Sequence, residues 1–389
     1  MSVRLAIIGA SGFVGSTLVE SLGNQSEFEV LPYIHGAGRA ARLARLGAPL
    51  HSVNLLDRSS LSQAIKSVDY VVNCSRGNNQ VMLEGLENLL DTCRREGVQR
   101  FVHLSSVAVY GDPPHPQSAD EVAPTQPVPA SYGALKLAQD QKVQKAAKAG
   151  LPSVILCPPN ITGPYSDYLC DIMSSIESGR FRLLDDGRSA VNIVDVRDLV
   201  TAIVLALRSQ VTNGQRLFIC DAEPVTWLDL CKELAPLIRQ GDAIASIPAE
   251  EFVDRYGGSG QQFQNKQSNA LKHLVSDGVR AALQVHPTWA QIEKRLRRLV
   301  GMLGNRIEER LQLTIAGPIK VPRITVQESL EVNLIRQQLR GIRHSINRAR
   351  EQLSYEPNYT FRQSMADFRH WHNGFCDGRS VLWQLLVNR

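Results

Sequence analysis

One stretch near the start of the chain restricts the possible folds most strongly. Residues 4–15 read RLAIIGASGFVG, in which a short apolar run leads into three glycines and a helical pattern follows. A strand that turns sharply into a helix needs glycine where the turn is tight and where the two elements pack closely. The motif therefore predicts the first strand and first helix of a parallel sheet.

The same alternation of short apolar runs and helical patterns continues over the first 157 residues. Strands are predicted at residues 4–8, 29–34, 69–74, 101–105 and 153–156, and helices at 12–22, 61–67, 81–96 and 132–149. Such a sequence predicts an α/β fold of the Rossmann type, a doubly wound parallel sheet with helices on both faces.

The regular alternation ends after the strand at 153–156, and polar loops follow. We expect residues 1–157 to form the Rossmann domain, with further elements from 190–220, where a helix (196–207) and a strand (215–219) are predicted. Residues 158–389 are expected to form mainly a smaller substrate-binding subdomain.

The stretch from about 255 to 330 has a different composition. It is rich in Arg and Gln, and its apolar residues recur at helical spacing among many charges. A solvated helical insertion is predicted there, and a helix that binds a partner or a membrane surface is the alternative.

Charge and cysteine content narrow the function classes. Lys and Arg exceed Asp and Glu by 43 − 38 = 5, without a concentrated basic face, so nucleic-acid binding is not expected. The seven cysteines are scattered and form no CxxC pair, which suits a reducing compartment. The initial apolar run of four residues is too short for a signal peptide, and no stretch approaches a membrane span. These features predict a soluble, cytoplasmic protein without integral membrane association.

The glycine turn also predicts a cofactor. Unpaired N–H groups and the positive dipole at a helix N-terminus attract a pyrophosphate, so we expect a dinucleotide at the turn. The expected contacts are Gly9, Ser11, Gly12, Phe13, Val14 and Gly15.

The second strand bears on which dinucleotide is bound. No carboxylate follows Glu29, whereas His35, Arg39 and Arg42 come after the strand. A carboxylate would accept from the ribose 2′-hydroxyl of NAD, while basic groups would attract a 2′-phosphate. NADP is therefore favoured over NAD, with His35 and Arg39 as contacts. The alternative is that the arginines form only a solvated helical turn.

Five motifs in order carry a family resemblance: GASGFVG at 9–15, HLSSVAVYG at 103–111, SYGALK at 131–136, PPNITGP at 158–164 and VDVRDL at 194–199. Together they resemble the extended short-chain dehydrogenase/reductase family, which includes nucleotide-sugar epimerases, dehydratases and ketoreductases. The resemblance covers about residues 1–230. The stretch at 353–371 resembles the family's closing helix, expected at about 360–372, and the loop before it.

The resemblance implies a catalytic set. A free phenol, with a pKa near 10, is a poor base at neutral pH, and a lysine one helical turn along favours the phenolate. By resemblance Tyr132 is the general acid/base, and Lys136 lowers its pKa and holds the nicotinamide ribose. Ser106 aligns with the serine that orients the reacting oxygen, with Ser105 as the near alternative.

Other positions are implied by the same resemblance. Further cofactor contacts are expected at Asn54, Leu55, Cys74, Ser75 and Pro159. Substrate contacts are expected at Val107, Asn160 and Arg188; the Asn160 position contacts the substrate diphosphate in sugar-nucleotide members. No metal site is expected, because His370 and His372 lack a third ligand nearby.

Three departures leave the substrate open. Cys157 and Val191 stand where sugar-nucleotide members often have arginines, and Asp195 replaces their histidine. The resemblance therefore implies an NAD(P)-dependent oxidoreductase that moves hydride at a carbinol or ketone carbon of a sugar-like substrate. A nucleotide-sugar epimerase and a ketoreductase are the main possibilities. A reductase of a non-nucleotide ketone or aldehyde and a non-catalytic NADP-binding sensor or scaffold are the alternatives. By resemblance, a homodimer is also possible.

Overall fold

The computed structural model describes residues 2–23, 25–36, 40–238, 244–256 and 330–375. Contacts divide the chain into two units, Met1–Phe252 with Leu330–Arg389, and Val253–Ser329. The predicted helical insertion at 255–330 lies almost wholly outside the described residues. The first unit contains all the elements discussed below, apart from the end of α9 (Ala249–Tyr256).

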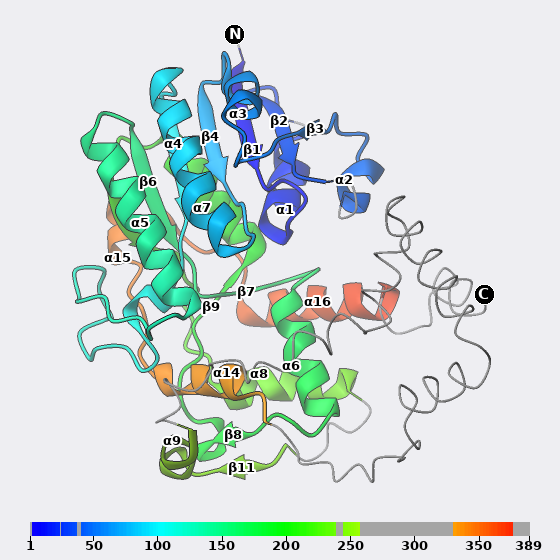
Figure 1. Ribbon diagram of the computed structural model, residues 1–389. Helices are drawn as coiled ribbons and strands as arrows, with labels where there is room; N and C mark the ends of the chain where they lie inside the picture. The colour runs from blue at the N-terminus through cyan, green and yellow to red at the C-terminus, as the bar shows by residue number, and fades with distance from the viewer. Residues whose placement is uncertain (1, 24, 37–39, 239–243, 257–329, 376–389) are drawn as a thin grey trace, which may run out of the picture. The chain divides into compact units, whose positions relative to one another are not determined.

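A seven-stranded parallel sheet lies at the centre of this unit (Figure 1). Its order is β10-β6-β5-β4-β1-β2-β3. The strands are β1 (Val3–Ile8), β2 (Phe28–Ile34), β3 (His51–Ser52), β4 (Tyr70–Asn73), β5 (Arg100–Leu104), β6 (Ser153–Cys157) and β10 (Asn213–Phe218). The chain winds in opposite directions from β1 and β4, which pair with each other, so their carboxyl ends form the switch point at which such sheets bind ligands.

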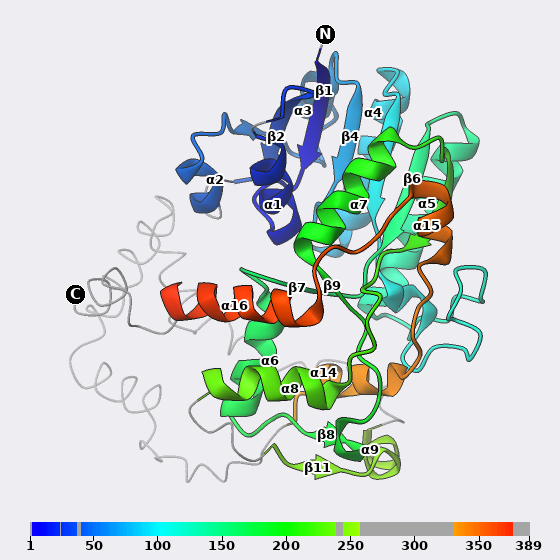
Figure 2. The same ribbon diagram turned by 180° about the vertical axis from the view of Figure 1, so that it is seen from behind.

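Helices cover both faces of the sheet, which confirms the predicted Rossmann fold. α1 (Phe13–Leu22) packs against α7 (Val196–Arg208) on one face, best seen in Figure 2. α3 (Arg58–Ile65), α4 (Leu86–Arg95) and α5 (Tyr132–Lys148) lie side by side on the other. A π-helical turn, Val81–Gly85, leads into α4.

The sequence prediction missed two short elements of this domain. Strand β3 has two residues, and helix α2 (Ala41–Arg45) has five. Elements this short carry too few residues for a periodic apolar pattern. β3 is nevertheless held in the sheet by parallel pairing with the end of β2.

Most of the remaining elements lie beyond the carboxyl edge of the sheet (Figure 1), whereas α15 (Asn347–Leu353) packs against β10 and α7. Two small parallel sheets pair β7 (Asn160–Thr162) with β9 (Ile193–Asp195), and β8 (Leu183–Leu184) with β11 (Ser246–Ile247). The helices are α6 (Asp167–Glu177), α8 (Trp227–Leu234), α14 (Val332–Arg336), α15 (Asn347–Leu353) and α16 (Phe361–Phe375). Short 3-10 turns span Val107–Tyr110, Asp185–Gly187, Ala235–Leu237 and Gln337–Arg340.

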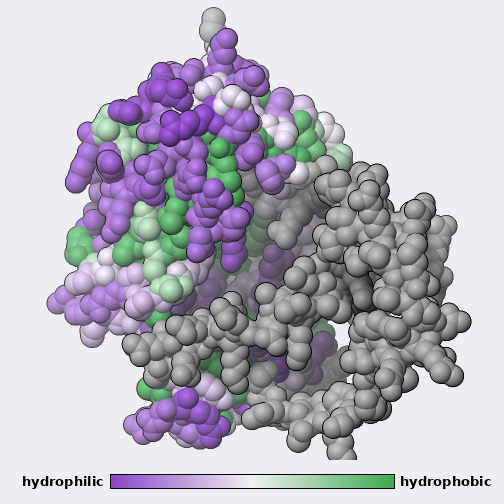
Figure 3. Space-filling model, viewed as in Figure 1, coloured by the Kyte–Doolittle hydropathy of each residue, from purple (hydrophilic) through white to green (hydrophobic). Residues whose placement is uncertain are grey.

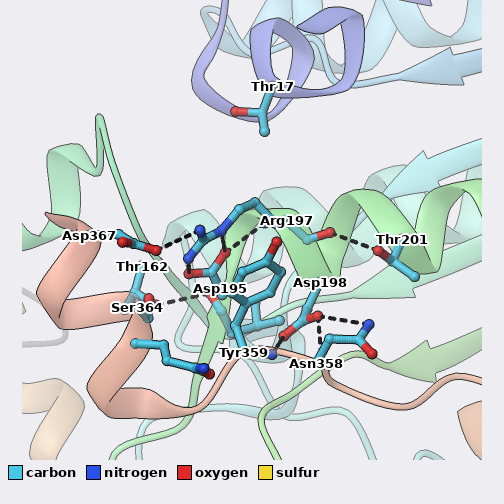
Figure 4. A network of polar contacts seen from close by, with 12 residues as sticks. Thr17, Thr162, Asp195, Arg197, Asp198, Thr201, Asn358, Tyr359, Ser364 and Asp367 are labelled. Carbon is cyan, nitrogen blue, oxygen red and sulfur yellow. Dashed lines mark hydrogen bonds and ion pairs between the residues drawn. The ribbon is translucent and has the colours of Figure 1, made fainter. Parts of the chain in front are cut away.

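A polar network holds α16 against α7 and β7 (Figure 4). Arg197 on α7 binds Asp195 at 2.8 Å and Asp367 of α16 at 2.6 Å. Asp198 accepts hydrogen bonds from the backbone N–H groups of Asn358 and Tyr359, at 2.8 and 3.0 Å. The last helix is thereby fixed at the end of the sheet domain despite its distance along the chain.

Helix α5 is anchored by a buried ion pair. Asp140, which is completely buried, binds Arg216 of β10 at 2.6 Å. Such a pair is worth little net stability but is costly to break, because one charge would be left buried alone. The pair therefore holds α5 in register against the sheet edge.

The face that carries α4 and α5 is largely hydrophilic, with hydrophobic groups interspersed (Figure 3), and an ion pair of 2.5 Å joins Lys142 to Glu87 across the two helices. The homodimer expected by resemblance stays a prediction. Among the described helices, none has the length and apolar character needed to span a bilayer. The six cysteines in the described part of the chain are all free thiols.

Candidate active site

The glycine turn between β1 and α1 is tightly packed. Gly9 has φ +81°, and a Cβ there would lie 2.8 Å from the backbone nitrogen of Ser75. A Cβ on Gly15 would lie 2.4 Å from the carbonyl oxygen of Gly9. Gly12 begins α1 without a side-chain cap, and the first turn contains no acidic residue. The turn thus offers uncapped helix N–H groups at a close backbone approach, which fits a dinucleotide pyrophosphate.

Most of the expected cofactor contacts in the described part of the chain follow the carboxyl ends of parallel strands, and therefore lie at one edge of the sheet. Six residues are in the turn after β1 and the start of α1, His35 follows β2, Asn54 and Leu55 follow β3, Cys74 and Ser75 follow β4, and Pro159 follows β6. Asn73 helps to shape this edge, because its Oδ1 accepts from the backbone N–H of Ser75 at 3.1 Å.

Of the three basic residues that follow the second strand, His35 and Arg42 belong to the described residues. His35 is exposed after β2, and Arg39 lies outside the described residues. The Nε of Arg42 donates to Glu20 at 2.7 Å, and its guanidinium stacks over the ring of Tyr165 at 4.1 Å. Arg42 is therefore engaged by protein groups, so it adds no support for NADP.

Helix α5 positions the tyrosine and the lysine. Ser131 caps the helix by accepting from the backbone N–H of Ala134 at 3.3 Å. The next residue, Tyr132, is 42% exposed, while Lys136, one turn further on, is only 5% exposed. The Lys136 Nζ donates to the carbonyl oxygen of Leu104 at 2.8 Å and lies 5.8 Å from the centroid of the Tyr132 ring.

A close backbone contact brings the start of α5 to the serine after β5. A Cβ on Gly133 would lie 2.2 Å from the carbonyl oxygen of Ala108, so glycine is needed for this approach. Ser106 begins the 3-10 turn that contains Ala108, and its Oγ accepts from the Ala108 N–H at 3.2 Å. Ser105, the alternative, is buried. The sequence-predicted trio of Ser106, Tyr132 and Lys136 thus comes from two elements in direct contact.

Burial shifts the pKa values of Tyr132 and Lys136 in opposite directions. Burial raises the pKa of Tyr132, and the charge of Arg76, whose Cζ lies 5.2 Å from the ring centroid, opposes this rise. Burial also lowers the pKa of Lys136 to about 8, although Asp140 acts in the other direction. The pKa of Tyr132 is raised overall, and Arg76 is the cation that lowers it; that Lys136 lowers this pKa stays a prediction.

The buried lysine leads to a stability prediction. Because Lys136 titrates near pH 8 when folded and near 10.5 when unfolded, its charge destabilises the fold at neutral pH. The shift from 10.5 to about 8 corresponds to about 3 kcal/mol, and the lost bond to Leu104 costs about 1 kcal/mol. Lys136→Met is therefore expected to raise the free energy of unfolding by about 2 kcal/mol at pH 7.

The advantage over the unsubstituted protein should shrink as the pH rises from 8 to 10.5, because the native lysine then loses its proton. Urea denaturation of both proteins across this range measures the difference. A variant that is less stable at pH 7, with no pH-dependent gap, would contradict the prediction.

The expected substrate contacts are placed as follows. Val107 is buried in the 3-10 turn after Ser106. The Asn160 amide donates to the hydroxyl of Tyr168 at 3.1 Å. Arg188 is exposed and paired with Asp186 at 2.6 Å.

The three positions that depart from sugar-nucleotide members are structural here. Cys157 and Val191 are both buried. Asp195 caps α7 by accepting from the Arg197 N–H, and it also binds the Arg197 side chain. None of these three side chains is free to hold a phosphate.

Comparison with known proteins identifies the group to which the site belongs. The sequence model of the NAD-dependent epimerase/dehydratase family matches residues 5–220, which are more than half of the chain. The chain belongs to the NAD-dependent epimerase/dehydratase family. The predicted family resemblance is thus confirmed, and the protein is an enzyme of the extended short-chain dehydrogenase/reductase type.

Individual relatives within this family are distant. 2-Alkyl-3-oxoalkanoate reductase of Stenotrophomonas maltophilia is 26% identical over 249 residues, which are 60% of this chain and 74% of that protein. Sterol demethylase protein B of Methylococcus capsulatus is 26% identical over 323 residues, covering 73% and 97%. The dTDP-glucose 4,6-dehydratase of Bacillus anthracis, solved with NAD, has a TM-score of 0.64 at 14% identity, covering 97% and 98%. That structural likeness supports the shared fold.

The sequence did not indicate two arginines near the candidate site. Arg76 follows Ser75 directly, and its position after a strand end is the signal that could have revealed it. Arg340 binds the carboxylate of Asp112, which follows the 3-10 turn. No local pattern connects these two residues, which are far apart in the sequence.

Proposed function

We propose that the enzyme transfers hydride between NAD(P) and a carbinol or ketone carbon of a small-molecule substrate, with Tyr132 as the general acid/base. The observation that carries this proposal is that the start of α5, with Tyr132 and Lys136, packs closely against the 3-10 turn that Ser106 begins. The nicotinamide supplies or accepts the hydride when it is bound.

Each side chain has a distinct role in the proposal. Ser106 orients the substrate oxygen, and Tyr132 gives a proton to that oxygen during reduction or takes one during oxidation. In the proposal Lys136 keeps a positive charge near the phenol and holds the nicotinamide ribose. A phenol with an ordinary pKa near 10 keeps its proton at neutral pH, which suits proton donation to a ketone.

A net reduction or oxidation of the substrate is better supported than an epimerisation. The positions that would hold a sugar-nucleotide diphosphate are occupied by buried Cys157, buried Val191 and the engaged Asp195. The 2-alkyl-3-oxoalkanoate reductase is named for a ketone substrate, which agrees with this proposal. We therefore favour a non-nucleotide ketone or its alcohol as the substrate.

A nucleotide-sugar epimerase is the second candidate. It is favoured by Asn160, which begins β7 and donates a hydrogen bond to the hydroxyl of Tyr168. An epimerase returns the hydride to its own substrate, whereas a ketoreductase releases oxidised cofactor.

The test separates these candidates directly. The purified enzyme is mixed with NADH or NADPH and 3-oxo acids or esters, and separately with UDP-glucose, while absorbance is followed at the nicotinamide band. We expect stoichiometric loss of the band with an oxo compound. Interconversion of the sugar without a net absorbance change would support the epimerase. Tight cofactor binding with neither reaction would support a sensor instead.

A further inference from the structure

Arg76 occupies an unusual place beside the proposed acid/base. It follows Ser75 just after β4, at the switch-point edge of the sheet, and its side chain is exposed. Its Cζ lies 5.2 Å from the centroid of the Tyr132 ring, slightly closer than the Nζ of Lys136 at 5.8 Å. Two cations from different elements therefore flank one phenol.

The guanidinium of Arg76 has no ion pair with any described residue. Other arginines near this edge are committed: Arg42 to Glu20, Arg197 to Asp195 and Asp367, and Arg340 to Asp112. An arginine presents a planar fork of donors that matches a carboxylate. Arg76 alone among these four keeps that fork open at the reaction site.

The charged groups near Arg76 are of both signs. Lys136 of α5 and Asp171 of α6 both interact with its charge, and Asp171 forms no ion pair with it. Burial raises the pKa of Asp171, as do the neighbouring charges of Asp167 and Glu331, while Arg76 lowers it. A substrate carboxylate placed between Arg76 and the phenol would approach two cations, Arg76 and Lys136.

We propose that Arg76 binds a carboxylate of the substrate, so that the enzyme acts on 2- or 3-hydroxy acids and the corresponding oxo acids. This inference rests on the proposed function, because the reacting carbinol is placed at Tyr132. In such a substrate a short carbon spacer joins the carboxylate to the reacting carbinol, because the Arg76 guanidinium lies close to the Tyr132 ring. Arg76 also offsets the repulsion that the substrate carboxylate would exert on a phenolate.

The test compares an acid with its ester. Oxidation of 3-hydroxydecanoate and of methyl 3-hydroxydecanoate is measured for the unsubstituted enzyme, Arg76→Gln, Arg76→Lys and the matched control Arg94→Gln. Arg94 is exposed in the last turn of α4, at the opposite edge of the sheet. Arg76→Gln is expected to lower kcat/KM for the acid by about 10- to 100-fold, mainly through KM, and for the ester by less than about threefold. Arg76→Lys should lie between, and Arg94→Gln should behave as the unsubstituted enzyme.

Two results would overturn the inference. An equal loss for acid and ester, with a displaced pH profile, would mean that Arg76 only tunes Tyr132. A loss of cofactor affinity in Arg76→Gln, measured by titration without substrate, would place Arg76 in the cofactor site.

A binding measurement keeps this inference separable from the proposed reaction. If neither compound is oxidised, calorimetry of the cofactor-loaded protein with decanoate and methyl decanoate is decisive. Decanoate binding that Arg76→Gln abolishes would support the anchor even though the proposed reaction had failed. Equal binding of acid and ester by both proteins would refute the anchor.

Discussion

Tyr132→Phe is expected to lower kcat by about 10²- to 10⁴-fold while cofactor affinity stays within about twofold. The variant removes only the hydroxyl that moves the proton, and the ring keeps its place beside Arg76 and Lys136. Turnover of the identified substrate, followed at the nicotinamide band, measures kcat, and fluorescence titration measures cofactor binding.

Tyr70→Phe is the matched control for this experiment. Tyr70 is the first residue of β4 and thus lies at the amino edge of the sheet, away from the proposed site. The control should keep its activity. If Tyr132→Phe also kept full activity, Tyr132 would not be the acid/base, and a non-catalytic role for the cofactor site would gain support.

Gly15→Val is expected to have the second large effect, a loss of cofactor affinity of at least about 100-fold. The Cβ alone would lie 2.4 Å from the Gly9 carbonyl oxygen and 2.8 Å from the Ala10 Cα, so the turn must move. Overpacking of this kind typically costs about 1–3 kcal/mol of stability. Cofactor titration and urea denaturation measure the two effects.

Gly374→Ala provides the comparison for Gly15→Val. Gly374 lies in α16 with no atom within 4 Å of its added Cβ, so the change should be neutral or slightly stabilising. Normal cofactor affinity in Gly15→Val would show that the turn is not the pyrophosphate site.

Local sequence patterns were sufficient for much of the sheet domain. The strands β1, β2, β4, β5 and β6 are rich in apolar residues, as is typical of parallel strands buried on both faces. Short β3 and α2 were missed because an element of two or five residues has no period to detect.

The electrostatics of the site could not be predicted in the same way. The spacing of Tyr132 and Lys136 is a local property of one helix, and it correctly places both residues in α5. Arg76 arrives from another strand, and its distance to the ring depends on how β4 and α5 pack. The raised pKa of Tyr132 likewise depends on burial by residues distant in the chain.

By itself the sequence determined the elements whose signals are local: the strands, the glycine turn, the helix cap at Ser131 and the spacing of Tyr132 and Lys136. Tertiary structure decided which charges meet. In the folded protein Asp140 pairs with Arg216 and Arg42 pairs with Glu20. Arg76 lies beside the phenol without an ion pair to a described residue. The physical reason is that periodicity and glycine sterics act over a few residues, whereas ion pairing and desolvation depend on distances in space.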